Sequence, residues 1–206
     1  IVYVDGDTYC NGNIQELFTS KSKLQASPDG FNLRTQLWKI LGDQAPEKLA
    51  TVHPYGEGIS ASFNSGVLAL SGDLISDSTY QDLLSLLNPT LYKHSDFGDQ
   101  MALNVYFKDN YEPISCRFNY MILVEEYIKG LENIISLDAK IIHFAGKIKP
   151  WYQYPREALF QLAPQYIKYI DAWQELYYEC QLSFEPNNRT QTVADKVARQ
   201  RQWQKE

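Results

Sequence analysis

The chain has 206 residues, of which 44% are hydrophobic and 14% aromatic, and this composition predicts a folded globular protein rather than a disordered segment. Its 19 basic and 25 acidic side chains give a net charge of −6, which argues against nucleic acid as a partner. The three cysteines are far apart and favour neither a disulfide framework nor a zinc site, and no apolar run is long enough to span a membrane.

The N-terminal residues and the cysteines give expectations about the extent of the chain and its cellular compartment. The chain begins on Ile1 inside an apolar run, without an initiating methionine, so we expect a piece of a longer protein that lacks its N-terminal part. No basic and apolar leader opens it, and widely spaced cysteines suit a reducing compartment. The sequence therefore predicts a cytoplasmic protein.

The first seven residues form a β-branched and aromatic run that ends in two acidic residues. Ile1 to Val4 predict a buried strand, and Asp5, Gly6 and Asp7 follow it directly. Side chains two residues apart in a strand project to the same side, so the two carboxylates are expected to converge, while Gly6 admits a ligand close to the backbone. The pattern favours a site for a cation and a phosphate, with an ordinary polar turn as the alternative.

Hydrophobic spacing and turn residues predict the elements of the first half of the chain. Residues 13–18 predict a short helix with Leu17 and Phe18 facing inward, and residues 21–32 predict a loop because they contain Ser-Pro-Asp-Gly. A helix is expected at 33–41, a buried strand over 63–70, and a helix over 77–87 that is capped by Asp77 or Ser78 and buries three leucines. A further helix is expected at 99–107.

The second half is predicted in the same way. Residues 120–128 are apolar enough for either a strand or a helix, and residues 140–144 predict a short strand that runs into a loop at Gly146. A helix over 165–180 carries an aromatic stripe that we expect to be core rather than a ligand platform. The tail after residue 187 predicts a solvated helix, with peripheral contact to an anionic membrane as the alternative. Its basic residues include Arg189, Lys196, Arg199, Arg201 and Lys205.

Of the three histidines, His143 has the most informative setting. His53 and His94 lie in polar loops, whereas His143 ends an apolar strand and Lys149 follows six residues later. Two carboxylates and one imidazole make a reasonable open site for a divalent transition metal, so Asp5 and Asp7 with His143 favour Mn²⁺ over Mg²⁺. Lys149 is then expected to face the anion bound to that metal.

Five short stretches together resemble glycosyltransferase family 8, the retaining sugar-nucleotide transferases that include glycogenin and bacterial lipopolysaccharide galactosyl- and glucosyltransferases. They occur in the family's order from residue 1 to about 151, which makes the combination more specific than any one motif. The stretches are Ile-Val-Tyr-Val-Asp-Gly-Asp at 1–7, Phe-Asn-Ser-Gly-Val at 63–67, Asp-Gln-Met-Ala-Leu-Asn at 99–104, Arg-Phe-Asn-Tyr at 117–120 and Ile-His-Phe-Ala-Gly-Lys-Ile-Lys-Pro-Trp at 142–151.

The resemblance implies a GT-A fold, an α/β domain with a mostly parallel sheet flanked by helices, here without its N-terminal nucleotide-binding part. It implies a catalytic domain over 1–160 and a helical extension over 161–206. The implied activity is metal-dependent transfer of a hexose from a UDP-sugar to a glycan or lipid-linked acceptor, with Mn²⁺ as the cofactor and Mg²⁺ as the alternative. The implied metal ligands are Asp5, Asp7 and His143; the donor-binding residues are Asp5, Asn64, Gly66, Gly146 and Lys149; and the catalytic residues are Asp99 and Gln100, with Gln100 nearest the anomeric carbon.

Two other functions compete with this interpretation. Haloacid-dehalogenase-like phosphatases also open with a strand into Asp-x-Asp, and here Asp5 would be the nucleophile, Asp7 the general acid, and Asp73 with Asp77 a later metal motif. That alternative leaves the stretch around His143 without a role. A glycan-binding or scaffold domain without catalysis is the other, because a fold does not fix a function.

Overall fold

The computed structural model describes residues 1–19, 22–29, 62–89, 93, 98–107, 110–152, 155–162 and 164–184. The helix expected at 33–41, the histidines His53 and His94, and the basic tail after residue 187 lie outside the described residues. None of the described helices is both long enough and apolar enough to cross a membrane.

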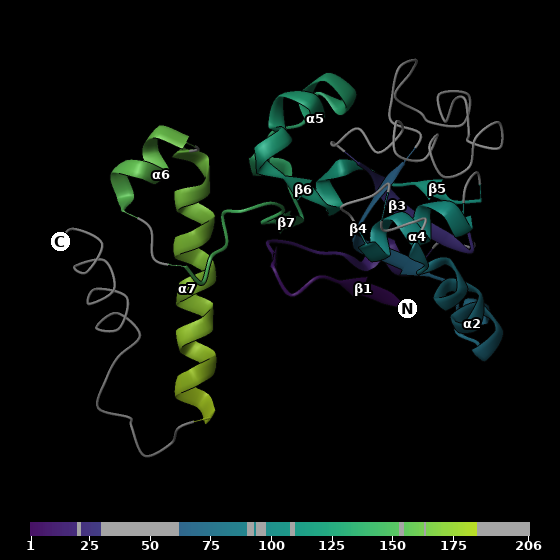
Figure 1. The fold of residues 1–206 in the computed structure, drawn as a ribbon. Coiled ribbons are helices and arrows are strands. Elements are labelled where there is room, and N and C mark those ends of the chain that lie inside the picture. The colour runs from purple at the N-terminus through teal and green to yellow at the C-terminus, as the bar shows by residue number, and fades with distance from the viewer. Residues whose placement is uncertain are drawn as a thin grey trace.

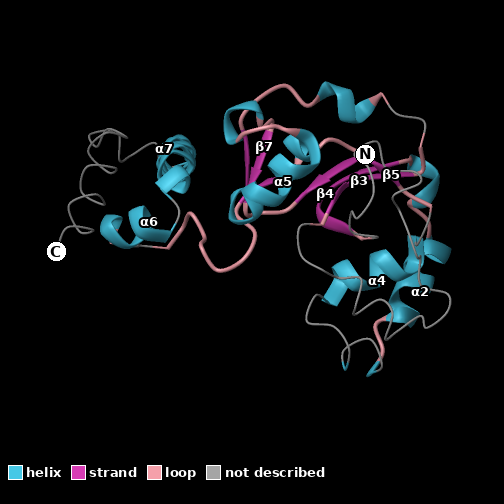
Figure 2. Cartoon of the chain, turned by 90° about the horizontal axis from the view of Figure 1, so that it is seen from above, coloured by secondary structure: helices cyan, strands magenta, loops and turns pink. Residues whose placement is uncertain are grey.

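The described strands form two sheets with helices around them (Figure 1). The first sheet has the order β1-β4-β3-β5 and the second has the order β2-β7-β6. Seen from above, α2 and α4 flank the first sheet, and α6 and α7 lie beyond β7 (Figure 2). The strands are β1 Val2–Val4, β2 Thr8–Cys10, β3 Leu24–Pro28, β4 Phe63–Leu70, β5 Glu112–Pro113, β6 Tyr120–Met121 and β7 Ile141–His143. The α-helices are α2 Asp77–Leu86, α4 Gly98–Phe107, α5 Glu125–Glu132, α6 Arg156–Leu162 and α7 Pro164–Phe184.

Both sheets are mixed, whereas a mostly parallel sheet was expected. β4 runs antiparallel to β1 and β3, and β2 runs antiparallel to β7, while the pairs β3–β5 and β6–β7 are parallel. The expected α/β class is confirmed. The buried strand expected at 63–70 is also present as β4, but burial shows only that both faces of a strand are covered and leaves the direction of its neighbours open.

Two other strands differ from expectation. β1 was expected to be buried, but it lies at the edge of the first sheet, where Tyr3 and Val4 are 47% and 44% exposed. Residues 24–28 were expected in a loop, but they form β3, which is buried throughout. Pro28 is tolerated because the register with β4 shifts between Ala26 and Pro28, and such an irregular position does not require the N–H that proline lacks.

The first helices also depart from the prediction. α2 begins after Ser76, whose Oγ accepts a hydrogen bond from the Thr79 N–H at 3.2 Å. Ser76 is therefore the N-cap, whereas Asp77 or Ser78 was predicted. None of the α2 leucines is buried. The short helix expected at 13–18 is a 3-10 helix over 15–18, in which Leu17 is buried but Phe18 is 62% exposed.

Residues 120–128, for which strand and helix remained open, contain both. β6 is followed by the 3-10 helix Ile122–Val124 and then by α5. α5 ends at Asn133, whose φ of 51° lies in the left-handed region that asparagine adopts more readily than most residues. Further 3-10 helices span Gly72–Leu74, Cys116–Phe118 and Ser136–Asp138.

One asparagine holds α4 against β4. Asn104 Oδ1 accepts a hydrogen bond from the Phe63 N–H at 2.9 Å, and Asn104 Nδ2 donates to the Phe63 carbonyl at 2.9 Å. Gln100 lies four residues earlier and therefore shares the face of α4 that points toward β4. Both amide side chains are buried. The helix expected at 99–107 is thus present as α4, and it presents polar groups to the sheet.

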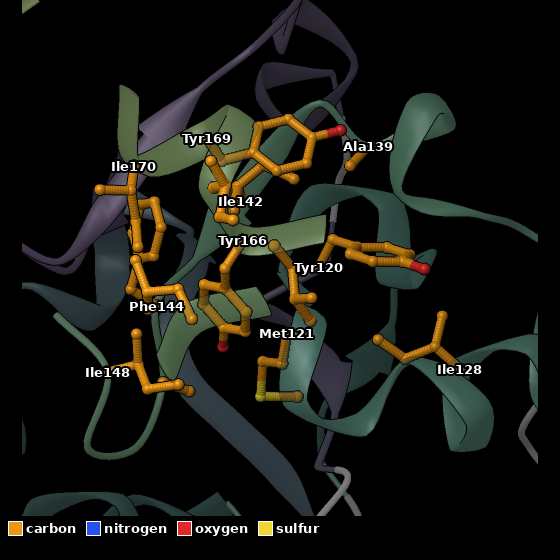
Figure 3. Packing of buried hydrophobic residues seen from close by; sticks show 14 of the residues in the cluster. Tyr120, Met121, Ile128, Ala139, Ile142, Phe144, Ile148, Tyr166, Tyr169 and Ile170 are labelled. Atoms are coloured by element: carbon orange, nitrogen blue, oxygen red, sulfur yellow. The ribbon is translucent and has the colours of Figure 1, made fainter. Parts of the chain in front are cut away.

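The core behind the second sheet includes α7 (Figure 3). The ring centroids of Phe144, just after β7, and Tyr166 lie 5.8 Å apart, and the Tyr169 hydroxyl donates to the Ser136 carbonyl at 2.6 Å. The expected core role of the aromatic stripe is confirmed for its beginning, whereas Tyr177 further along is 45% exposed. The division of the chain at residue 160 stays a prediction, and α6 spans that position.

The packing of α7 on β7 predicts unequal effects for two tyrosines on the same helix. Tyr166→Ala should lower the free energy of unfolding by about 3–5 kcal/mol, because it removes a fully buried ring and leaves a cavity. Tyr177→Ala should cost less than about 1.5 kcal/mol, because that ring is half exposed and mainly stacks on Trp173. Denaturant unfolding of both variants measures the difference, and equal losses would show that α7 does not pack as described.

Candidate active site

The two opening carboxylates lie in a turn that crosses from the first sheet to the second. β1 ends beside β4, where the Asp5 N–H donates to the Gly66 carbonyl at 2.8 Å. β2 begins beside β7, where the Phe144 N–H donates to the Asp7 carbonyl at 2.9 Å. The carboxylates were expected to converge through strand alternation, but the turn around Gly6 brings them together instead. The expected convergence is therefore present, with a different cause.

His143 closes the group from the end of β7. Its Nε2 lies 3.8 Å from Asp5 Oδ2 and 3.4 Å from Asp7 Oδ1, and the side chain is almost fully buried. The three prospective ligand atoms all lie within 4.8 Å of one another. The structure thus brings together the three residues that the sequence predicted as metal ligands, and they are the one such group among the residues that it describes.

Gly66 makes room for the imidazole. A Cβ atom built on Gly66 would lie 2.2 Å from His143 Cε1 and 2.5 Å from His143 Nδ1, far inside van der Waals contact. Gly66 was expected to contact the donor, and the structure places it against the ring of His143. The cavity in front of this ring is lined by Asn64 and Ser65 from the same strand.

Hydrogen bonds hold both carboxylates in place. Lys149 Nζ donates to Asp7 Oδ2 and, at 2.9 Å, to the Phe144 carbonyl. Burial alone would raise the pKa of Asp7, but hydrogen bonds and charge interactions with His143 and Lys149 outweigh it and hold that pKa well below its usual range. The Tyr3 hydroxyl donates to Asp5 Oδ1 at 2.6 Å, and this bond is the main reason why the pKa of Tyr3 is raised to about 12.

Gln100 enters the site from the first turn of α4. Its Oε1 accepts hydrogen bonds from Asn64 Nδ2 at 2.9 Å and from the Ser65 N–H at 3.1 Å. Its Nε2 is buried and has no hydrogen-bond partner among the described residues. A buried donor without a partner costs free energy, so this N–H is a ready contact for a ligand hydroxyl.

These groups line one cavity of about 540 Å³, a size typical of small-molecule sites. Its described lining comes from the turn after β1, from β4, from the start of α4 and from the segment that follows β7. The lining residues are Asp5, Asp7, Asn64, Ser65, Gly98, Asp99, Gln100, His143, Ala145, Gly146 and Lys149. Each site residue predicted from the sequence except Gly66 is among them.

Two residues at the site were missed by the sequence analysis or had no role in it. Tyr3 holds Asp5, and its signal was the spacing of two that places both side chains on one side of β1. Asn119 had appeared only within a motif, yet it is fully buried between His143 and Asn64.

A larger cavity of about 790 Å³ lies near β5, but Lys23 and Glu112 are the only charged residues in its described lining.

The phosphatase alternative does not fit the strand directions. β1 and β4 are antiparallel, so Asp5 lies beside Gly66 in the middle of β4, whereas Asp73 and Asp77 follow the C-terminal end of β4. Gly66 and the C-terminal residue of β4, Leu70, are four residues apart, which is about 13 Å along the strand. Asp73 and Asp77 also do not line the cavity that holds Asp5 and Asp7. The two acidic pairs therefore do not form one site.

The residues present fit a divalent cation. Two carboxylates and one imidazole nitrogen leave open coordination positions, as sites that bind a metal and a substrate together require. His143 Nδ1 is already bonded to Asn119 Oδ1 at 2.8 Å, so Nε2 is the ring nitrogen that faces the carboxylates. An imidazole held through its other nitrogen is the usual arrangement of a metal ligand.

Comparison with known sequences gives a consistent result. The model of Glycosyl transferase family 8 matches residues 1–154. Galactinol synthase 5 of Arabidopsis thaliana is 31% identical over 207 residues, which cover 96% of this chain and 59% of that protein. Glycosyltransferase GlyF of Streptococcus pneumoniae is 26% identical over 183 residues, which cover 87% of this chain and 40% of that protein. The chain therefore spans little more than half of the first relative and less of the second.

Solved structures share the fold. Glycosyltransferase GlyE of Streptococcus pneumoniae matches 74% of this chain and 35% of its own, with a TM-score of 0.51 and 23% identity. The galactosyltransferase LgtC, solved in complex with donor and acceptor sugar analogues, matches 74% of this chain and 55% of its own, with a TM-score of 0.50 and 22% identity. The expected GT-A fold is confirmed by these likenesses.

Two glycines of the site should respond differently to alanine. Gly66→Ala should cost about 1–3 kcal/mol of unfolding free energy, because its methyl group must displace the imidazole of His143. Gly6→Ala is the matched control, since a Cβ atom there meets nothing within 4 Å. Denaturant unfolding compares the two, and a tolerated Gly66→Ala would show that the ring does not pack on β4.

The lowered pKa of Asp7 predicts a dependence of stability on pH. Since the folded state binds this proton less well than the unfolded chain, Asp7 stabilises the fold above about pH 4, and the contribution is lost as pH falls further. Between about pH 7 and pH 3 the native protein should lose about 1–2 kcal/mol more than Asp7→Asn. Unfolding curves at both pH values measure this loss, and identical losses would show that Asp7 is not held by His143 and Lys149.

Proposed function

Because this chain belongs to Glycosyl transferase family 8 and has the GT-A fold, we propose that its cavity transfers a hexose from a UDP-sugar to an acceptor with retention of configuration. The observation that carries the proposal is the convergence of three acidic residues, an imidazole and an amine on one cavity from parts of the chain more than 130 residues apart. Membership of the family makes the chain a glycosyltransferase. The donor, the cation and the acceptor class are proposals.

The charges of the site suggest how a diphosphate is accommodated. Asp5, Asp7 and Asp99 would repel an anionic donor, so a cation at Asp5, Asp7 and His143 is needed for attraction. Mn²⁺ suits this mixed oxygen and nitrogen set, with Mg²⁺ as the alternative. When bound, the cation supplies Lewis acidity to the phosphate oxygen that leaves with UDP.

Lys149 brings a positive charge to the cavity and is the one lysine or arginine in its described lining. It is anchored by the Phe144 carbonyl at 2.9 Å, which fixes its amine near the wall formed by Ala145 and Gly146. A fixed ammonium stabilises charge that develops on a leaving phosphate more strongly than charge that is already dispersed. We assign the diphosphate to Lys149 and Gly146.

Gln100 and Asp99 are proposed to face the donor sugar. Gln100 Oε1 is occupied by three donors from Asn64 and Ser65, so this oxygen is turned away from the role of a nucleophile. Its Nε2–H remains to bind a sugar hydroxyl. This arrangement favours attack on the face that the leaving group vacates over a covalent intermediate on Gln100.

The acceptor is proposed to be a glycan or a lipid-linked glycan. The relatives include galactinol synthases, and LgtC was solved with sugar analogues of both substrates, so UDP-galactose and UDP-glucose are the first donors to test. A cytoplasmic location and a contact of the basic tail with a membrane surface remain proposals.

Metal-dependent release of UDP from UDP-galactose or UDP-glucose tests the activity. In the full-length protein, Asp7→Asn and His143→Ala should each lower the rate by at least about 100-fold, because each removes a proposed metal ligand. Asp73→Asn is the matched control, since Asp73 is exposed and lies away from the cavity. Binding of sugar without turnover would support the alternative of a non-catalytic glycan-binding domain.

One substitution at Gln100 separates positioning of the sugar from binding of the nucleotide. Gln100→Ala should lower kcat by about 10- to 100-fold, because it removes a donor to the sugar, and it should leave the affinity for UDP within about threefold. The two quantities are measured by steady-state kinetics and by calorimetry with UDP. A loss of UDP affinity with unchanged kcat would place Gln100 at the nucleotide instead.

A further inference from the structure

A row of buried amide side chains connects Gln100 to His143. Asn64 Nδ2 donates to Gln100 Oε1 at 2.9 Å, and Asn119 Nδ2 donates to Asn64 Oδ1 at 2.8 Å. Asn119 Oδ1 then lies 2.8 Å from His143 Nδ1. All four side chains are less than 9% exposed, so water does not replace these partners.

Two backbone N–H groups fix the direction of every bond in this row. The Ser65 N–H donates to Gln100 Oε1 at 3.1 Å, and the Gly66 N–H donates to Asn64 Oδ1 at 2.9 Å. Since a backbone N–H only donates, both atoms that it reaches are amide oxygens and not nitrogens. The orientations of the Gln100 and Asn64 amides are therefore set by the backbone of β4, without any choice between oxygen and nitrogen.

The orientation of the Asn119 amide in turn determines which nitrogen of His143 carries the hydrogen. Asn119 must direct its NH₂ group at the oxygen of Asn64, which leaves its own oxygen facing His143 Nδ1. Two lone pairs at 2.8 Å would repel, so Nδ1 carries the hydrogen. A neutral imidazole has only one N–H, so in the neutral ring Nε2 presents its lone pair to Asp5 and Asp7. The protonated ring has a hydrogen on both nitrogens, and only in that form does Nε2 donate to Asp7 and lower its pKa.

We infer that Asn119 is a positioning residue that holds His143 in the Nδ1–H tautomer, so that Nε2 is a ready ligand for the cation. The inference rests on the proposed function for the cation but on the structure alone for the tautomer. Two interactions compete for the single hydrogen of the neutral ring. The carboxylates of Asp5 and Asp7 attract it onto Nε2, and the oxygen of Asn119 holds it on Nδ1 instead. Without Asn119, the carboxylates would favour the Nε2–H tautomer, whose Nε2 has no lone pair for the cation.

The tautomer is measured directly by long-range ¹⁵N–¹H correlation spectra of the metal-free protein, recorded at an alkaline pH at which the ¹⁵N shifts themselves show a neutral ring. The signals of His143 are identified by their loss in His143→Gln. We expect the pattern of an Nδ1–H imidazole. An Nε2–H pattern would overturn the inference whether or not the protein binds a metal or a donor.

Variants of Asn119 test the consequence for the metal, with Mn²⁺ alone as the probe and electron paramagnetic resonance as the readout. Asn119→Leu should weaken Mn²⁺ binding by about 10- to 100-fold, the range typical for the partner of a metal-binding histidine. Asn119→Asp retains an oxygen that accepts from Nδ1, so it should restore most of the affinity although it breaks the bond to Asn64. Equal loss in both variants would contradict the role.

A second buried amide serves as the control for stability. Gln174 in α7 is 3% exposed, and its Nε2 donates to the Pro150 carbonyl at 2.9 Å. Gln174→Leu should lower thermal stability as Asn119→Leu does but leave Mn²⁺ affinity unchanged. If the native protein binds no Mn²⁺, the metal-dependent function fails while the spectrum of His143 still decides the tautomer. If Asn119→Leu does not fold, the spectrum and Asn119→Asp carry the test.

Discussion

The contact between the imidazole of His143 and the backbone of Gly66 is the point on which the rest of the site depends. It is where β7 of the second sheet meets β4 of the first, and a single methyl group on Gly66 would occupy the space of the ring. The turn from Asp5 to Asp7 crosses between the same two sheets and is bonded to both. The position of the group formed by Asp5, Asp7 and His143 is therefore fixed by how the sheets are joined, and not by any one strand.

The polar groups at this junction are buried or partly buried, so each needs a hydrogen-bond partner or a partner of opposite charge. Asp7 meets this requirement through Lys149 and His143, and the interactions are strong enough to outweigh the effect of burial on its pKa. Asn64 and Asn119 meet it through one another and through the backbone of β4. Gln100 is the exception, because its amide nitrogen remains unpaired among the described residues where the cavity opens. In a network that is otherwise complete, an unpaired buried donor needs an explanation, and the proposed contact with the donor sugar supplies one.

Much of this site could be predicted from the sequence, because motifs fix residue types and spacing. Asp5, Asp7, His143 and Lys149 were chosen as acidic, imidazole and amine groups at the ends of apolar runs, and the structure gathers them in one cavity. The predictions that were wrong concern features that depend on packing between segments far apart in the chain. The loop expected at 21–32 contains the buried strand β3, since burial overrides the turn tendency of Ser-Pro-Asp-Gly.

The roles of single residues were harder to predict for the same reason. Gly66 was predicted to contact the sugar donor, because a glycine lets a ligand approach the backbone closely. In the structure it is the imidazole ring of His143 that lies against Gly66. Asn119 gave no signal beyond its motif, since an isolated asparagine before a tyrosine is ordinary, and its two partners lie 24 and 55 residues away in the chain. Sequence patterns identify the groups that perform chemistry more readily than the groups that orient them.

The central claim is that one cavity holds a cation and a diphosphate between the turn after β1, β7 and Lys149. A crystal structure of the protein soaked with Mn²⁺ and UDP, with an anomalous difference map recorded at the manganese edge, tests it most directly. The account predicts a single strong peak bonded to Asp5, Asp7 and His143, with the diphosphate density reaching Lys149. A peak elsewhere, or UDP bound without contact to these residues, would contradict it.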